Sequence, residues 1–313
     1  MARGHGPAVI AMEDEMRGRL FGLSGLAAVF ALTLWTGTSA QTPAAGGAAP
    51  VGQAGAGQRQ GGAAVARPQS PTFARIQART YDFKEAGMAM PYEVYVPTKY
   101  DASKPTPLII ALHGLGSNPT QIIRYQSLTD LAEERGYIVA APMGYNSGGW
   151  YGSQGTGLPR VGRGRGDQSA IPANLGELSE LDVMNVLGLM KKEFNVDPSR
   201  TYLFGHSMGG GGTWHIGMKH PEIWAALGPV APAIYSSEDA LEAIKGTPVI
   251  VVQGDNDNLV DVAVTRRWVE KMKSLGMKYE YIEVAGGSHT DIITANPPNM
   301  KKIFDFFDQA RRK

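Results

Sequence analysis

The sequence has 313 residues, of which 43% are hydrophobic and 19% are charged, as in soluble globular proteins with a full core. Its formal net charge of +1 gives no indication of electrostatic attraction to nucleic acid or to an anionic membrane. The absence of cysteine excludes disulfides, a thiolate nucleophile and cysteine–zinc sites.

Residues 1–40 are predicted to be a leader that contains a secretory signal peptide. Arg17 and Arg19 precede an apolar run over residues 20–35, and small residues follow up to Ala40, an order typical of such signals. The alternative is a membrane-spanning anchor, which needs about 20 apolar residues, whereas this run is shorter and contains glycine. We therefore expect cleavage near Ala40, a secreted or periplasmic protein and no stable membrane anchor. Three acidic residues lie directly before Met16 and are unfavourable for export, so we expect translation to begin at Met16.

Residues 41–71 are nearly all Ala, Gly, Gln and Pro, with no large apolar side chain except valine. Such a segment cannot bury enough surface to offset the entropy of ordering it, which predicts a disordered linker. The folded domain is therefore expected over residues 72–313, a length that suits one α/β domain.

Within this domain, short β-rich segments alternate with helical ones. Several strands are apolar almost throughout, as strands buried on both faces of a sheet are. One helix is predicted to begin near Ser179, with Asp182 completing a capping box, a second follows Asp261, and a third covers residues 300–310. The alternation predicts an α/β fold with a mainly parallel sheet covered by helices on both faces. The predicted strands are 92–96, 108–112, 137–141, 201–204, 225–230, 248–253 and 279–284.

A glycine-rich turn, His113-Gly114-Leu115-Gly116, follows the predicted strand 108–112. At the end of a core strand, such a turn can direct backbone N–H groups at a negative charge that develops on an oxygen atom. We assign the amide of Leu115 as one oxyanion donor. The ring of His113 is expected to fix the turn rather than to take part in the chemistry.

A long insertion, residues 143–178, leaves the sheet edge at which parallel sheets bind ligands. A loop of this length inside a compact domain is usually functional or disordered. Trp150 and Tyr151 are candidates for the substrate pocket, where they would stack on an aromatic or sugar ring. The alternative is that they hold the loop against the body of the domain. Three arginines of the insertion are expected to be solvated charges rather than an anion site: Arg160, Arg163 and Arg165.

The nucleophile is predicted from Gly205-His206-Ser207-Met208-Gly209, which follows the predicted strand 201–204. This G-x-S-x-G motif lies between a strand and an apolar helix, the context in which a tight, strained turn presents a serine hydroxyl. Ser207 is the predicted nucleophile, and the amide of Met208 is the second predicted oxyanion donor.

A serine hydroxyl needs a base within hydrogen-bond reach, and with this motif the acid and the histidine follow the nucleophile along the chain. Of the six histidines, only His289 comes after the last predicted strand, so it is the predicted base. The acid is expected in the turn after strand 248–253, where Asp255 and Asp257 compete. Its carboxylate would orient the imidazole and stabilise the protonated ring.

Two segments carry a resemblance to a known group of enzymes: Phe194-Asn195-Val196-Asp197-Pro198-Ser199-Arg200 and the motif at residues 205–210. They resemble secreted polyhydroxybutyrate depolymerases and feruloyl esterases of the α/β-hydrolase superfamily, and are similar to prolyl-oligopeptidase-like catalytic domains. The resemblance extends over about residues 92–307, although the group's frequent cysteines are absent and the insertion is unusually long. The implied roles are nucleophile for Ser207, acid for Asp257 (three residues after the glycine), base for His289 and oxyanion donor for Leu115.

The predicted function is hydrolysis of a small-molecule or polymeric carboxylic ester through an acyl-enzyme, with no metal or organic cofactor. A serine peptidase acting on short peptides is the alternative, because it would use the same groups. A non-catalytic binding protein on the same fold is disfavoured, because it would have no reason to retain the three residue types in this order.

Overall fold

The computed structural model describes residues 70–154 and 172–312. The predicted leader, residues 41–69 of the predicted linker and the three arginines of the insertion lie outside the described residues. No helix in these two described ranges is long and apolar enough to cross a bilayer.

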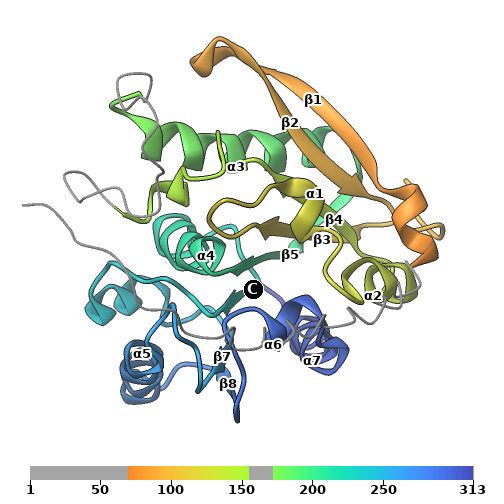
Figure 1. The fold of residues 1–313 in the computed structure, drawn as a ribbon. Helices are drawn as coiled ribbons and strands as arrows, with labels where there is room; N and C mark the ends of the chain where they lie inside the picture. The colour runs from red at the N-terminus through yellow and green to blue at the C-terminus, as the bar shows by residue number, and fades with distance from the viewer. Residues whose placement is uncertain (1–69, 155–171, 313) are drawn as a thin grey trace, which may run out of the picture. The chain divides into compact units, whose positions relative to one another are not determined.

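An eight-stranded sheet with the order β1-β2-β4-β3-β5-β6-β7-β8 runs through the described domain (Figure 1). β2 pairs antiparallel with both β1 and β4, and the other neighbours run parallel, which confirms the mainly parallel sheet. The strands are β1 (Gln77–Phe83), β2 (Met88–Tyr95), β3 (Thr106–Leu112), β4 (Ile138–Pro142), β5 (Val196–His206), β6 (Ala226–Val230), β7 (Val249–Gly254) and β8 (Tyr279–Val284).

Helices cover both faces of this sheet, as predicted, and each face has its own apolar cluster. One cluster joins the sheet to α3 (Leu175–Glu193), α4 (Met208–Lys219) and α5 (Val262–Ser274). The other joins it to α1 (Pro119–Ile122), α2 (Leu128–Arg135), α6 (Asp291–Thr294) and α7 (Pro297–Asp308). Short 3-10 helices complete the elements: η1 (Pro71–Arg75), η2 (Lys84–Ala86), η3 (Trp150–Gly152) and η5 (Glu238–Ile244).

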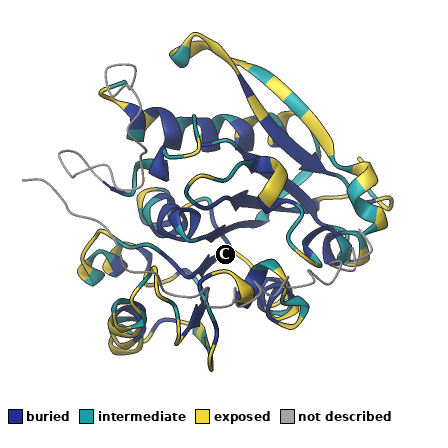
Figure 2. Cartoon of the chain, in the orientation of Figure 1, coloured by how far each residue is buried: buried dark blue, intermediate teal, exposed yellow. Residues whose placement is uncertain are grey.

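Every predicted strand forms, but β1 was not predicted. Its side chains are exposed or half-buried until Phe83, because it pairs at the edge of the sheet in a hairpin whose outer part is exposed (Figure 2). An edge strand of this kind lacks the continuous apolar run by which the inner strands were identified, such as β3, in which every residue is buried.

The predicted capping box at Ser179 is wrong. Helix α3 begins at Leu175, so Ser179 and Asp182 lie inside it and are buried. Their side chains instead bind the backbone of the insertion: Ser179 Oγ donates to the carbonyl of Gly144, and Asp182 Oδ2 accepts the N–H of the same residue. A polar residue inside a helix can look like a cap in the sequence when its true partner is a distant loop.

Helix α4 packs against its neighbours through glycines. The close contacts that these glycines allow offset their low helix propensity. A Cβ atom on Gly209 would lie 2.1 Å from the carbonyl oxygen of Leu112, and one on Gly211 would lie 2.1 Å from that of Ala233. On Gly212 it would lie 2.6 Å from the ring of Tyr151. The glycine run therefore allows the start of α4 to approach the end of β3 and the insertion more closely than any other residue type would.

We expect Gly209→Ala to lower the free energy of unfolding by about 1–3 kcal/mol, because backbone must move to relieve the overlap. Gly188→Ala is the matched control: Gly188 is an exposed helical glycine with no atom within 4 Å of an added Cβ, so its replacement should be neutral or stabilising by up to about 1 kcal/mol. Urea denaturation followed by circular dichroism measures both. Equal effects would contradict the close-packing explanation.

Candidate active site

Ser207 lies between β5 and α4 in a strained backbone conformation, with φ of 60° and ψ of −116°. Its N–H donates to the carbonyl of Val230 at 2.9 Å, and its carbonyl accepts the N–H of Ala233 at 3.0 Å. Gly205 must be a glycine, because a Cβ there would lie 2.1 Å from the carbonyl oxygen of Gly209. The positive φ is unusual for a residue with a side chain, and it persists here because these contacts on both sides fix the turn.

The structure brings the side chains of Ser207, His289 and Asp257 together. His289 Nε2 lies 2.8 Å from Ser207 Oγ, and His289 Nδ1 lies 2.7 Å from Asp257 Oδ2. A carboxylate can only accept, so Nδ1 carries the hydrogen and Nε2 has the lone pair that accepts from the serine hydroxyl. This neutral tautomer is the one in which His289 can take a proton from Ser207.

Asp257, and not Asp255, is the carboxylate at the imidazole. The N–H groups of Leu259 and Val260 donate to Asp257 Oδ1, both at 2.9 Å, and the Gln253 amide donates to Oδ2 at 2.9 Å. Burial alone would raise the pKa of Asp257, but the hydrogen bonds from Val260, His289 and Leu259 hold it below its usual value. Asp255 Oδ1 instead accepts the N–H of Gly286 at 2.7 Å and so fixes the turn after β8.

One predicted oxyanion donor, Met208, follows Ser207 directly, and the other, Leu115, follows Gly114 in the turn after β3. A Cβ on Gly114 would be 3.4 Å from Ser207 Cβ, so the turn after β3 touches the nucleophile's side chain. Within the described residues, the N–H groups of Leu115 and Met208 have no hydrogen-bond acceptor. Met208 is also the first residue of α4, where the helix dipole favours negative charge. His113 is buried, and its ring nitrogens each lie 2.8 Å from a carbonyl oxygen, of Gly114 and of Met143, so the ring joins this turn to the insertion.

The two aromatic residues of the insertion have different surroundings. Tyr151 has no exposed surface; its N–H donates to Ser179 Oγ at 3.0 Å and its hydroxyl to the His113 carbonyl at 3.3 Å. The Trp150 ring packs edge-on against the ring of Tyr235, with centroids 5.1 Å apart, and Tyr235 is 41% exposed. Tyr151 thus fastens the loop to the domain, whereas Trp150 belongs to an aromatic pair that reaches the surface.

Sequence reasoning missed His206 and Tyr125. The Nε2 atom of His206 lies 2.8 Å from the carbonyl oxygen of His289, and its Nδ1 atom lies 2.8 Å from the hydroxyl of Tyr125. His206 precedes Ser207 along the chain, so chain order does not favour it as the base. Its position next to the nucleophile was the only signal in the sequence, since the groups that it contacts come from distant segments.

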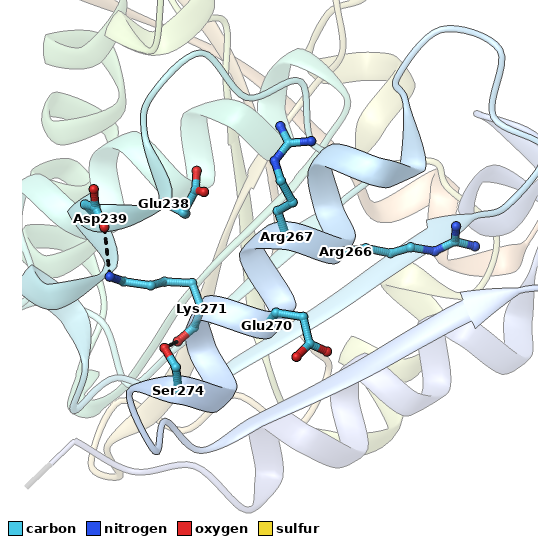
Figure 3. A pocket seen from close by; sticks show the side chains of 7 residues that line it. All are labelled: Glu238, Asp239, Arg266, Arg267, Glu270, Lys271 and Ser274. Carbon is cyan, nitrogen blue, oxygen red and sulfur yellow. Dashed lines mark hydrogen bonds and ion pairs between the residues drawn. The ribbon is translucent and has the colours of Figure 1, made fainter.

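A separate groove of about 450 Å³ lies between η5 and α5 (Figure 3). Its walls are charged, and Lys271 pairs with Asp239 at 2.8 Å across it. None of the three residues Ser207, His289 and Asp257 lines this groove. Across the described ranges, no group of three or more His, Asp or Glu side chains is arranged to hold a metal ion.

Comparison with known proteins gives a family match. The family model named Esterase, described as "Putative esterase", matches residues 84–290, which is more than half of the chain. The chain is 28% identical over 182 residues to a bifunctional acetylxylan esterase/xylanase of Neocallimastix patriciarum, covering 58% of this chain and 23% of that protein. It is also 28% identical over 156 residues to the S-formylglutathione hydrolase of Bos taurus, covering 49% and 55%. The chain therefore spans less than two thirds of the length of these relatives.

Solved structures share the fold. A thermostable esterase superposes with a TM-score of 0.60 at 22% identity, covering 77% of this chain and 64% of that one. The CE1 ferulic acid esterase of Anaeromyces mucronatus superposes with a TM-score of 0.58 at 19% identity, covering 75% and 90%. The fold is therefore that of the α/β-hydrolases, as the sequence predicted.

We expect Asp257→Asn to lower kcat/KM for p-nitrophenyl acetate by about 10⁴-fold, because an amide donor at this position favours the wrong tautomer of His289. Asp255→Asn is the matched control in the same turn and should stay within about twofold, because its oxygen can still accept from Gly286. A larger loss in Asp255→Asn than in Asp257→Asn would contradict the geometric assignment.

Proposed function

We propose that this chain, a member of the Esterase family, hydrolyses carboxylic esters with Ser207, His289 and Asp257 as its reacting groups. The observation that carries the proposal is the unbroken line of hydrogen bonds from Asp257 through His289 to Ser207 Oγ. A serine hydroxyl is a poor nucleophile unless a base accepts its proton as it attacks. His289 has its Nε2 lone pair in hydrogen-bond reach for that transfer.

In the acylation step, His289 Nε2 takes the hydroxyl proton while Ser207 Oγ attacks the ester carbonyl carbon. The carbonyl oxygen becomes an oxyanion, which accepts hydrogen bonds from the Leu115 and Met208 amides; each such donor is worth about 3 kcal/mol. The ionised carboxylate of Asp257 stabilises the imidazolium. The carbon–oxygen bond to the leaving group then breaks, and His289 returns its proton to the departing alcohol.

In the deacylation step, water replaces the alcohol. His289 Nε2 takes a proton from the water, whose oxygen attacks the acyl carbon of the Ser207 ester. The same two amides hold the second oxyanion. Collapse of this intermediate releases the carboxylic acid, and His289 returns its proton to Ser207 Oγ, so the free enzyme is restored.

We further propose that Trp150 lines the substrate pocket and that Tyr151, buried against α4, holds Trp150 in place. Tyr235 lies two residues after Ala233, whose N–H binds the Ser207 carbonyl, so the aromatic pair belongs to a segment anchored at the nucleophile. Trp150 itself is 6% exposed and Tyr235 is 41% exposed, so most of the aromatic surface that this pair can offer to a flat ring belongs to Tyr235. The substrate class proposed is therefore a small-molecule or polymeric ester with an aromatic or sugar ring close to the scissile bond.

Secretion or periplasmic export is also proposed, on the basis of the leader sequence alone. The order of basic, apolar and small residues up to Ala40 supports it. N-terminal sequencing of protein purified from the culture medium or periplasm tests it, and the mature chain is expected to begin directly after Ala40. Retention of the intact leader on cell-associated protein would contradict export.

We expect Ser207→Ala to lower kcat for p-nitrophenyl acetate by about 10⁶-fold, because no other group in the site can form the acyl-enzyme. A fluorophosphonate probe should label Ser207 in the wild-type protein and leave Ser207→Ala unlabelled. Ser274→Ala, in the groove away from the site, is the control and should be labelled normally. Label on a different residue would overturn the nucleophile assignment.

We expect Trp150→Ala to raise KM for methyl ferulate about 3- to 10-fold more than KM for p-nitrophenyl acetate, because one aromatic contact contributes about 0.5–1.5 kcal/mol. A dipeptidyl anilide in the same panel tests the peptidase alternative. Equal changes for the aromatic acyl and acetyl substrates would show that Trp150 does not contact the acyl group.

A further inference from the structure

We infer that His206 and Tyr125 are positioning residues that hold the base His289 at its distance from Ser207. The inference rests on the role proposed above for His289. The site then has a second line of hydrogen bonds, from Tyr125 through His206. This line ends at the backbone carbonyl of His289 rather than at its ring.

The direction of this second line follows from the chemistry of its members. The carbonyl oxygen of His289 can only accept, so His206 Nε2, at 2.8 Å, must carry a hydrogen. In the neutral ring Nδ1 then has the lone pair, and it accepts from the Tyr125 hydroxyl at 2.8 Å. Tyr125 therefore selects the tautomer in which His206 can donate to His289.

The loop that carries the base needs such a tie. The N–H of Gly286 donates to Asp255 Oδ1 at 2.7 Å and the carbonyl of Gly287 accepts the N–H of Asn256 at 3.1 Å, so these contacts hold the turn but do not reach His289. In the described part of the chain, the contact from His206 is the one hydrogen bond made to the backbone of His289. A further bond ties the segment of Tyr125 to the chain that follows the base, because the N–H of Gln126 donates to the carbonyl of Thr294 at 3.2 Å.

The charge state of His206 suits this role. The ring is 3% exposed, and its centroid lies 5.1 Å from that of His289. Burial lowers the pKa of His206 to about 4, so the ring is neutral at neutral pH. A cationic ring at this distance would oppose the imidazolium that forms on His289, whereas a neutral ring can donate a hydrogen bond without this repulsion.

The position of His206 couples the nucleophile to the base. It is the last residue of β5, and Ser207 follows it directly, so His206 is fixed by the sheet through its pairing with Val230. Any shift of the loop at His289 relative to β5 must break or stretch the bond to His206. The strand that ends just before the nucleophile thus also positions the base, through the hydrogen bond from His206.

His206→Phe tests the hydrogen bond, because it keeps a ring in the site and removes the donor. We expect kcat for p-nitrophenyl acetate to fall about 10- to 100-fold, with KM within about twofold, since a displaced base affects the chemical step and not the binding of substrate. His206→Gln should recover most of the loss, because its side-chain N–H can take the place of Nε2–H. A residue that only filled space would give the opposite order, since Gln is a poorer substitute for a ring than Phe.

Tyr125→Phe provides an independent measurement in case His206→Phe does not fold. We expect a loss in kcat of about 3- to 10-fold, the value of one hydrogen bond. Tyr137→Phe is its control: Tyr137 is buried whereas Tyr125 is half-buried, and the hydroxyl of Tyr137 donates to Asp308 at 2.6 Å, away from the site. Tyr137→Phe should lose stability in urea denaturation and keep its kcat.

The inference is overturned if His206→Phe folds and keeps wild-type kcat, if His206→Gln is no more active than His206→Phe, or if Tyr125→Phe and Tyr137→Phe have equal kcat. Fluorophosphonate labelling of wild-type Ser207 in the same experiment separates this failure from that of the proposed function. Normal labelling together with any of these results contradicts the inference alone. Failure of the wild-type protein to label contradicts the role of Ser207, and the inference with it.

Discussion

The hydrogen bond between His289 Nε2 and Ser207 Oγ is 2.8 Å long and joins residues 82 positions apart, so it depends on the strands that bring these residues together. Ser207 follows β5, Asp257 follows β7 and His289 follows β8. These strands run parallel, so their carboxyl ends lie at one edge of the sheet, and short turns there are enough to bring the three side chains together. The order and direction of the strands therefore place the three residues at one edge of the sheet, where their side chains can make contact.

The electrostatics of the site follow from which groups stay charged. Asp257 is kept ionised by backbone N–H groups and by His289, although its side chain has no exposed surface. His206, equally buried, has no anionic partner and is kept neutral. One ring thus forms a hydrogen bond to a fixed negative charge, and the other forms hydrogen bonds only to neutral groups. This difference supports the proposal that His289 transfers the proton while His206 makes a fixed hydrogen bond, although both are imidazoles in contact with one another.

The sequence allowed prediction of those features that have a local signature. The inner strands are continuous apolar runs, so the fold class could be predicted without long-range information, and the glycines on both sides of Ser207 allowed it to be predicted as the nucleophile in the same way. His289 followed from chain order. The choice of Asp257 over Asp255 needed family resemblance, because two carboxylates two residues apart differ only in which turn N–H groups they meet. His206 could not be recognised, since its partner carbonyl lies 83 residues further along the chain.

The wrongly predicted helix cap has a structural explanation in the way the insertion is anchored to the domain. Ser179 and Asp182 have the spacing of a helix cap, yet they lie inside α3 and bind the first residues of the loop. Tyr151 fills the space left by Gly212 on α4 and bonds to the turn after β3. The residue next to Trp150 is thus fixed by the same elements, α4 and the oxyanion turn, that fix Ser207. A residue anchored in this way has the fixed position of a core residue, and this supports the proposal that Trp150 beside it has a defined place near the reacting groups.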